Sequence, residues 1–246
     1  MRPTAARARC LVVQHVEAEG PYIIAEVLAG AGVKLDLRAL PTGAGLPSNL
    51  DGYQGIVVMG GPVSATSDAG FPTRVAEMSL LEQALERGVP TLGTCLGAQL
   101  LALAAGGKVY AGMEGPEIGW GSVSLAEEAR TDPILAGLPG ELTVLHWHSD
   151  TFDVPPASKQ LASTRLYPNQ AFRVGNMAWG LQFHLEVNSD AIQAFLAVFG
   201  DEARAAGVEP EAIAAEAPLA LAQLAVPRRR VFERFAALVR ARAARG

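Results

Sequence analysis

The chain has 246 residues, of which 50% are hydrophobic and 18% are charged, so it can bury a full core. Its formal net charge of -5 gives no general attraction for nucleic acid or for anionic membrane, and no apolar run is long enough to span a bilayer. Two cysteines are too few for a disulfide framework, which favours the reducing cytoplasm. We therefore expect small-molecule or protein partners.

The Arg-rich residues 1–9 are similar to a targeting leader. A secretory signal needs an apolar stretch of about 7–15 residues, and the apolar residues 10–13 are followed too soon by polar Gln14 and His15. We interpret this segment as a frayed tail of a cytoplasmic protein.

The first half of the chain alternates apolar strands with helices. We predict strands over residues 10–13, 33–40, 56–59 and 89–93, and helices over residues 22–29, 74–87 and 99–105. The second strand alternates apolar with charged residues and should lie at or near a sheet edge. This alternation predicts an α/β fold with an open, mostly parallel, doubly wound sheet of the flavodoxin-like kind.

The second half shows shorter strands joined by turns. We predict strands over residues 108–111, 118–125, 142–146, 160–164, 170–174 and 178–183, and one helix over residues 190–199. An additional mixed or antiparallel region is therefore expected beside the parallel sheet.

The segment after Gly200 is rich in Ala, Glu and Arg and predicts a C-terminal helical extension, which Pro218 and Pro227 should break. Its last helix carries an apolar face made of Val231, Phe235, Leu238 and Val239, and several arginines make it basic. We interpret it as a helix packed on the preceding domain. The alternative is a docking surface for a partner or an anionic ligand.

Residues 93–99 (GTCLGAQ) place Cys95 between small residues, where an apolar strand meets an apolar helix. A nucleophile on a sharp strand-to-helix turn is pushed out of the sheet, and glycines let the backbone pass close to a substrate. The first helical amides also favour a thiolate over a thiol. We interpret Cys95 as a nucleophile.

Two further segments complete a candidate site. Gly60 and Gly61 follow a buried strand and could form a tight turn. A phosphate cradle is disfavoured because neither a P-loop lysine nor the dinucleotide fingerprint is present, and we favour amides that help form an oxyanion hole beside Cys95. His184 lies just past an apolar strand with Glu186 two residues later, so cysteine, histidine and acid together indicate acyl transfer.

A second polar cluster contains His146, His148 and Asp150. Histidines at this spacing could indicate a metal, but a third convincing ligand is missing. We favour loop hydrogen bonds that line the same crevice as Cys95, and we expect no metal and no cofactor.

Three motifs resemble those of the class I glutamine amidotransferases, and within them the GMP-synthase-like, stand-alone group. They are residues 93–99 as the nucleophile elbow, residues 60–62 (GGP) as the oxyanion loop, and residues 182–186 (QFHLE) as the histidine and glutamate segment. The resemblance implies an amidotransferase domain over residues 8–200 and a helical extension over residues 201–246. Ala98 and Leu185 depart from the common family residues, histidine and proline.

The resemblance implies that Cys95 attacks the side-chain amide of glutamine while His184 moves protons and Glu186 orients it. The amide of Leu96 and one from Gly60 or Gly61 would stabilise the oxyanion. Gln99 and the backbone around His148 and Ser149 would hold the amino-acid end of the substrate.

The ammonia released has no evident consumer in this chain, because the glycine- and serine-rich ATP loop of a synthase does not occur in it. We expect either transfer to a separate synthase subunit or hydrolysis of a γ-glutamyl compound. A third hypothesis is a non-catalytic redox or binding module of the DJ-1-like kind, which would need Cys95 but neither His184 nor Glu186.

Overall fold

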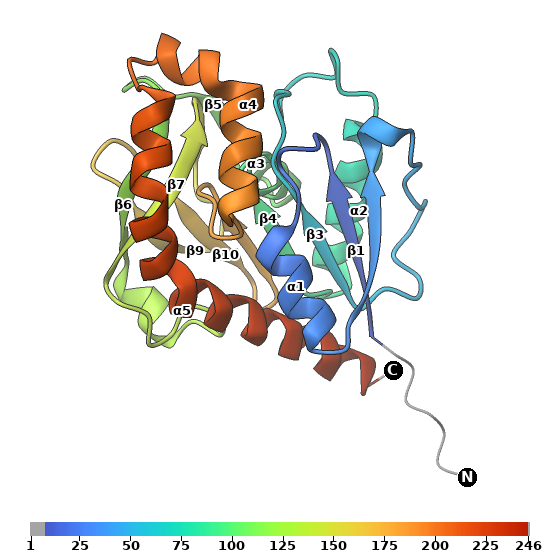
Figure 1. Cartoon of the computed structure of the whole chain (residues 1–246). Helices are drawn as coiled ribbons and strands as arrows, with labels where there is room; N and C mark the ends of the chain where they lie inside the picture. The colour runs from blue at the N-terminus through green and yellow to red at the C-terminus, as the bar shows by residue number, and fades with distance from the viewer. Residues whose placement is uncertain (1–7, 246) are drawn as a thin grey trace.

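A twisted sheet of nine strands runs through the computed structural model, which describes residues 8–245 (Figure 1). Across the sheet the strand order is β2-β1-β3-β4-β11-β10-β9-β6-β7. The strands are β1 (Arg9–Gln14), β2 (Lys34–Ala39), β3 (Gly55–Val58), β4 (Thr91–Thr94), β6 (Glu117–Leu125), β7 (Glu141–His148), β9 (Lys159–Ser163), β10 (Ala171–Val174) and β11 (Ala178–Leu181). Most of the expected N-terminal tail, residues 1–7, lies outside the described residues.

The five strands β2, β1, β3, β4 and β11 pair in parallel, which confirms the predicted α/β fold with a doubly wound sheet. β2 lies at the edge, as its alternating sequence predicts. Successive side chains of β1 enter different layers: Cys10 and Val12 join one apolar cluster, and Leu11 and Val13 join the other. A strand buried on both faces needs such a continuous apolar run.

Helices cover both faces of this parallel half. Figure 1 shows α1 (Tyr22–Gly30) in front of the sheet, with α2 (Arg74–Glu86) and α3 (Leu96–Ala104) behind it. Short 3-10 turns occur at Leu40–Thr42 and Glu127–Thr131. α3 begins three residues earlier than predicted, directly after Cys95, so its first amides lie at the turn.

The remaining strands, from β10 to β7, pair in antiparallel fashion, as expected for the second half. β5 (Val109–Ala111) pairs separately with β8 (Asp150–Phe152), a strand that the sequence analysis missed. β8 has three residues, Asp-Thr-Phe, and so short a mixed stretch carries no readable period. α4 (Ser189–Ala205) packs Phe195 and Phe199 against Trp147 of β7.

The C-terminal segment forms one helix, α5 (Pro210–Ala243), with Pro218 and Pro227 inside it, so the predicted breaks are wrong. A proline removes one backbone donor and bends a helix, but the chain can continue where buried contacts hold both sides. Figure 1 shows α5 as two limbs that meet at an angle. Ile213 is buried against α4, and Phe235 is buried in the layer that contains α1.

The apolar face of α5 packs on the sheet, as interpreted from the sequence. Val231, Phe235 and Val239 are fully buried, and a Cβ at Gly55 of β3 would lie 2.6 Å from a methyl group of Val239.

Arginines of this segment donate to backbone carbonyls of the rest of the chain: Arg230 to Gly137 at 2.9 Å, Arg234 to Ile134 at 3.2 Å and Arg242 to Gly88 at 2.9 Å. These contacts support packing on the domain over a free docking surface. Among the helices within residues 8–245, none combines the length and apolar character needed to cross a membrane.

Candidate active site

Four neighbouring parallel strands end at one edge of the sheet, and a polar or glycine-rich segment follows each of them. Glu19 follows β1, Gly60 and Gly61 follow β3, Cys95 follows β4 and His184 follows β11. The carboxyl ends of parallel strands face a common crevice. The fold therefore brings together the predicted Cys95, His184 and glycine pair, and adds Glu19, which was not predicted.

Cys95 occupies a strained turn between β4 and α3, with φ 51° and ψ -109°. A left-handed φ at a non-glycine residue is uncommon and is typical of nucleophile elbows. Gly93 and Gly97 make the turn possible, because a Cβ on Gly93 would overlap the carbonyl of Gly97, and one on Gly97 would overlap that of Val58. The elbow predicted from residues 93–99 is thus present.

His184 and Glu186 form a fully buried pair, with His184 Nδ1 2.7 Å from Glu186 Oε1. A ring nitrogen of His184, the Cys95 sulfur and a Glu19 carboxylate oxygen all lie within 4.8 Å of one another. Since Glu186 engages Nδ1, and Nε2 is the nitrogen 4.0 Å from Glu19, Nε2 faces the sulfur. A neutral ring would therefore donate through Nδ1 and accept at Nε2.

The thiol and the imidazole have shifted pKa values. Burial raises the pKa of the Cys95 thiol, and the smaller opposing effects of His184 and the Leu96 amide do not cancel it. The Leu96 amide favours the thiolate, as expected, but desolvation outweighs this effect and the net pKa of the thiol rises. Burial also acts to lower the pKa of His184, but Glu186 and Cys95 raise it well above its ordinary value. Glu186 therefore stabilises the charged ring that forms when a neutral His184 takes the proton of Cys95.

The predicted oxyanion loop lies against the elbow: a Cβ on Gly60 would lie 3.3 Å from Cys95 Cβ, and one on Gly61 3.1 Å from a Leu96 methyl group. The carbonyl of Gly60 accepts a hydrogen bond from His15 Nδ1 at 2.9 Å. A trans peptide directs its N–H opposite to its carbonyl, so the Gly61 N–H points away from His15. Gly61 and Leu96 both line the cavity at Cys95.

The surroundings of His15 favour its charged form. Its Nδ1 meets the Gly60 carbonyl, and its Nε2 lies 2.8 Å from Glu77 Oε2, while Thr73 donates to the other Glu77 oxygen at 2.7 Å. Both partners of the ring are acceptors, so both nitrogens carry a proton. Although burial acts to lower it, the pKa of His15 is raised by Glu77 and by the Gly60 carbonyl. Sequence analysis missed this role, for which the position of His15 directly after β1 was the available signal.

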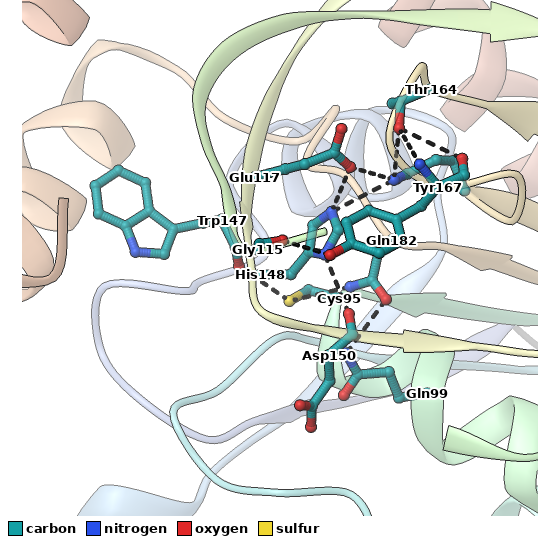
Figure 2. Close-up of polar contacts among 11 residues, drawn as sticks. Cys95, Gln99, Gly115, Glu117, Trp147, His148, Asp150, Thr164, Tyr167 and Gln182 are labelled. Atoms are coloured by element: carbon teal, nitrogen blue, oxygen red, sulfur yellow. Dashed lines mark hydrogen bonds and ion pairs between the residues drawn. The ribbon is translucent and has the colours of Figure 1, made fainter. Parts of the chain in front are cut away.

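A cavity of about 420 Å³ opens at Cys95 and is lined by the three predicted substrate-binding residues Gln99, His148 and Ser149. Figure 2 shows Gln99 and Gln182 beside Cys95. Gln99 Nε2 donates to Gln182 Oε1 at 3.2 Å, and Gln182 Nε2 donates to the Cys95 sulfur at 3.6 Å. Gln182 was named only as part of a motif, and its contact with the thiol depends on β11 lying beside β4.

The His148 side chain belongs to a polar network of the antiparallel half (Figure 2). Its Nε2 lies 3.2 Å from Glu117 Oε2, and its Nδ1 lies 3.1 Å from the Asp150 carbonyl oxygen. His146, expected to line the same crevice, instead lines a separate cavity of about 370 Å³ together with Glu117. His148 and Asp150 do line the cavity at Cys95, as expected, and the carboxylate beside His148 is that of Glu117, which was not predicted.

Within residues 8–245, two clusters have ligand atoms close enough to hold a metal ion: Glu19 with Cys95 and His184, and Glu117 with His146 and His148. The first coincides with the reactive thiol, so a metal there would block it. The second has an imidazole and carboxylate donor set that suits zinc or iron. In it, the contact between His148 and Glu117 is already satisfied without a metal.

Comparisons with known proteins identify the family of the chain. The family model described as glutamine amidotransferase class-I matches residues 18–200. The chain is 30% identical over 194 residues to the glutamine amidotransferase-like protein YfeJ of Salmonella typhimurium, covering 77% of this chain and 80% of that one. A crystal structure of a glutamine amidotransferase from Thermotoga maritima superposes with a TM-score of 0.85 at 31% identity, covering 94% and 98% of the two chains.

Two relatives carry more specific names. A GMP synthase [glutamine-hydrolyzing] of Porphyromonas gingivalis is 37% identical over 145 residues, which is 58% of this chain and 26% of that protein. Gamma-glutamyl peptidase 4 of Arabidopsis thaliana is 27% identical over 147 residues, 58% of each chain. The chain therefore belongs to the class I glutamine amidotransferase family.

Proposed function

We propose that this protein hydrolyses the side-chain amide of glutamine through a Cys95, His184 and Glu186 triad. The observation that carries the proposal is the meeting of an elbow cysteine with a buried, carboxylate-paired histidine at one sheet edge. A redox or binding module of the DJ-1-like kind would need the cysteine alone. The buried imidazole beside the thiol, paired with the Glu186 carboxylate, favours catalysis over that alternative.

In the proposed first step, the Cys95 sulfur attacks the amide carbon and its proton passes to His184 Nε2. The carbon–nitrogen bond then breaks as the nitrogen takes that proton from His184, so ammonia leaves and a glutamyl thioester remains. In the second step water attacks the thioester, its proton passes to His184 and then returns to the sulfur as glutamate leaves. Glu186 holds the ring and stabilises its charged form.

The carbonyl oxygen of the substrate becomes negative in both steps. The Leu96 amide at the start of α3 and an amide of Gly60 or Gly61 would bind it. Gln99 and the backbone at His148 and Ser149 would hold the amino-acid end, since all three line the same cavity as Cys95.

We propose further that the ammonia serves a separate synthase-type partner. The match covers only 26% of the P. gingivalis GMP synthase, so most of that protein lies outside the match. On this proposal residues 8–200 form the amidotransferase domain and residues 201–246 an extension that packs on it. Hydrolysis of a γ-glutamyl compound is the second candidate, favoured by the similarity to a γ-glutamyl peptidase.

The test is labelling with a glutamine-like electrophile, a diazo ketone analogue, followed by mass spectrometry. We expect one label on Cys95 that glutamine blocks. Cys10 is the internal control, because it is fully buried and burial raises the pKa of its thiol far above the ordinary value. A label on Cys10, or one on Cys95 that glutamine does not reduce, would contradict the proposal.

Ammonia release from glutamine and amine release from γ-glutamyl peptides, measured side by side, would separate the two candidates. A higher kcat/KM on glutamine supports the amidotransferase. A higher value on the peptides supports the peptidase.

A further inference from the structure

We propose that Glu19 accepts a hydrogen bond from the leaving nitrogen of the scissile bond and so makes the site selective for amides over esters. This inference rests on the proposed triad and adds a specificity residue to it.

Glu19 lies in the loop after β1 and is 5% exposed. Its carboxylate lies beside the oxyanion loop, where a Cβ on Gly60 would overlap Glu19 Oε2. Within the described part of the chain, Glu19 Oε2 and His184 Nε2 are both buried without a hydrogen-bond partner. Unpaired buried polar atoms are costly, so two that face each other across 4.0 Å beside a thiol indicate a missing ligand group.

The three atoms are close enough together for one nitrogen atom to reach all of them. Because the Cys95 sulfur, the His184 nitrogen and the Glu19 oxygen lie within 4.8 Å of one another, some point lies within about 2.8 Å of all three, a hydrogen-bond distance from nitrogen and oxygen. The leaving nitrogen must approach this place, since it is bonded to the carbon that the sulfur attacks and takes its proton from His184.

The chemistry of the leaving group then decides the contact with Glu19. An amide nitrogen turns its lone pair to His184 and keeps N–H groups, one of which can donate to the Glu19 carboxylate. An ester oxygen has no such hydrogen, and its lone pairs would face the carboxylate. A site built around an N–H donor rejects the analogue that lacks it, because its own acceptor stays unpaired.

The charges around Glu19 are mixed. Burial raises its pKa to about 7, His184 and His15 act to lower it, and Glu186 and Glu202 act to raise it. The ionised form, which accepts the hydrogen bond best, is therefore favoured by the two histidines and by pH values above about 7.

The test compares kcat/KM for glutamine and for glutamate γ-methyl ester in the unmodified full chain and in Glu19→Gln and Glu19→Met. We expect the amide-to-ester ratio to fall about tenfold or more in both variants. The Gln variant should also gain on the ester, because its Nε2 can donate to the leaving oxygen. Glu17→Gln, an exposed neighbour in the same loop, is the matched control and should leave the ratio unchanged.

An equal fall on both substrates in the variants would overturn the inference and assign Glu19 to pairing with His184. An unchanged ratio with both activities intact would also overturn it. If the unmodified chain hydrolysed neither substrate, the proposed triad itself would be wrong. Labelling of Cys95 in each variant shows whether that variant is folded.

Discussion

The two halves of the sheet contribute to the site in different ways. In the parallel half, β1, β3, β4 and β11 all end at the same edge, so each reactive group follows its strand within a few residues. In the antiparallel half, β6 and β7 bring Glu117 and His148 together through pairing across the sheet. The parallel strands thus place the reactive groups together at one edge, whereas the antiparallel strands position side chains that support the cavity.

Removing the reactive groups of the parallel half should have the largest effect. Cys95→Ala and His184→Ala should each lower kcat for glutamine by about 10⁴-fold or more, because the triad acts as a unit. Ammonia release in a coupled assay measures this, and the double variant should be little worse than either single one. Retained activity in both variants would remove the basis for assigning the chemistry to this half.

The next effect concerns the support of the oxyanion loop. Glu77→Gln removes the carboxylate that favours the charged His15 ring, so a neutral ring can still donate to the Gly60 carbonyl but no longer polarises the Gly60–Gly61 peptide with a positive charge. We expect kcat to fall about tenfold or more with little change in KM, since the loop acts on the transition state.

The pH dependence of kcat tests the role of Glu77 further. Glu77 raises the pKa of His15 in the unmodified protein. In Glu77→Gln the ring should deprotonate nearer about pH 6.5, so kcat should decline as pH rises through that value. The same decline in the unmodified protein would show that Glu77 does not hold the charge.

Glu19 should lower stability in exchange for selectivity. Its pKa of about 7 lies above its ordinary value, so the folded state holds the proton more tightly than the unfolded one, and stability falls as pH rises from about 4.5 to 7. Above pH 7, Glu19→Gln should therefore raise the free energy of unfolding by roughly 2–3 kcal/mol. Urea unfolding at pH 5 and pH 8 measures this, and an equal gain at both values would contradict it.

The smallest effect is expected in the antiparallel half. Glu117→Gln weakens the contact that positions His148, so KM for glutamine should rise a few-fold while kcat changes little. His146, which lines the separate cavity, offers the comparison: His146→Gln should leave both constants near their original values. A large loss of kcat in Glu117→Gln would show that this half takes part in the chemistry.

The sequence alone determined those features whose signal is local. Continuous apolar runs such as residues 10–13 indicated buried strands, and small residues around Cys95 indicated the elbow. The alternation of strands and helices along the chain was enough to predict the α/β sheet. In such a sheet the parallel strands all end at the same edge. The pairing of His184 with Glu186 was also readable, since the two residues are neighbours in sequence.

Tertiary structure decided the features that depend on long-range packing. Burial of Cys95 outweighs the helix amides and raises the pKa of its thiol, and buried contacts on both limbs keep α5 continuous through its two prolines. Glu19 lies beside the Cys95 thiol although 76 positions of sequence separate them. Glu117 contacts the imidazole of His148, which is 31 positions away in sequence. Local patterns report the preference of a segment, whereas desolvation and side-chain contacts exist only once distant segments meet.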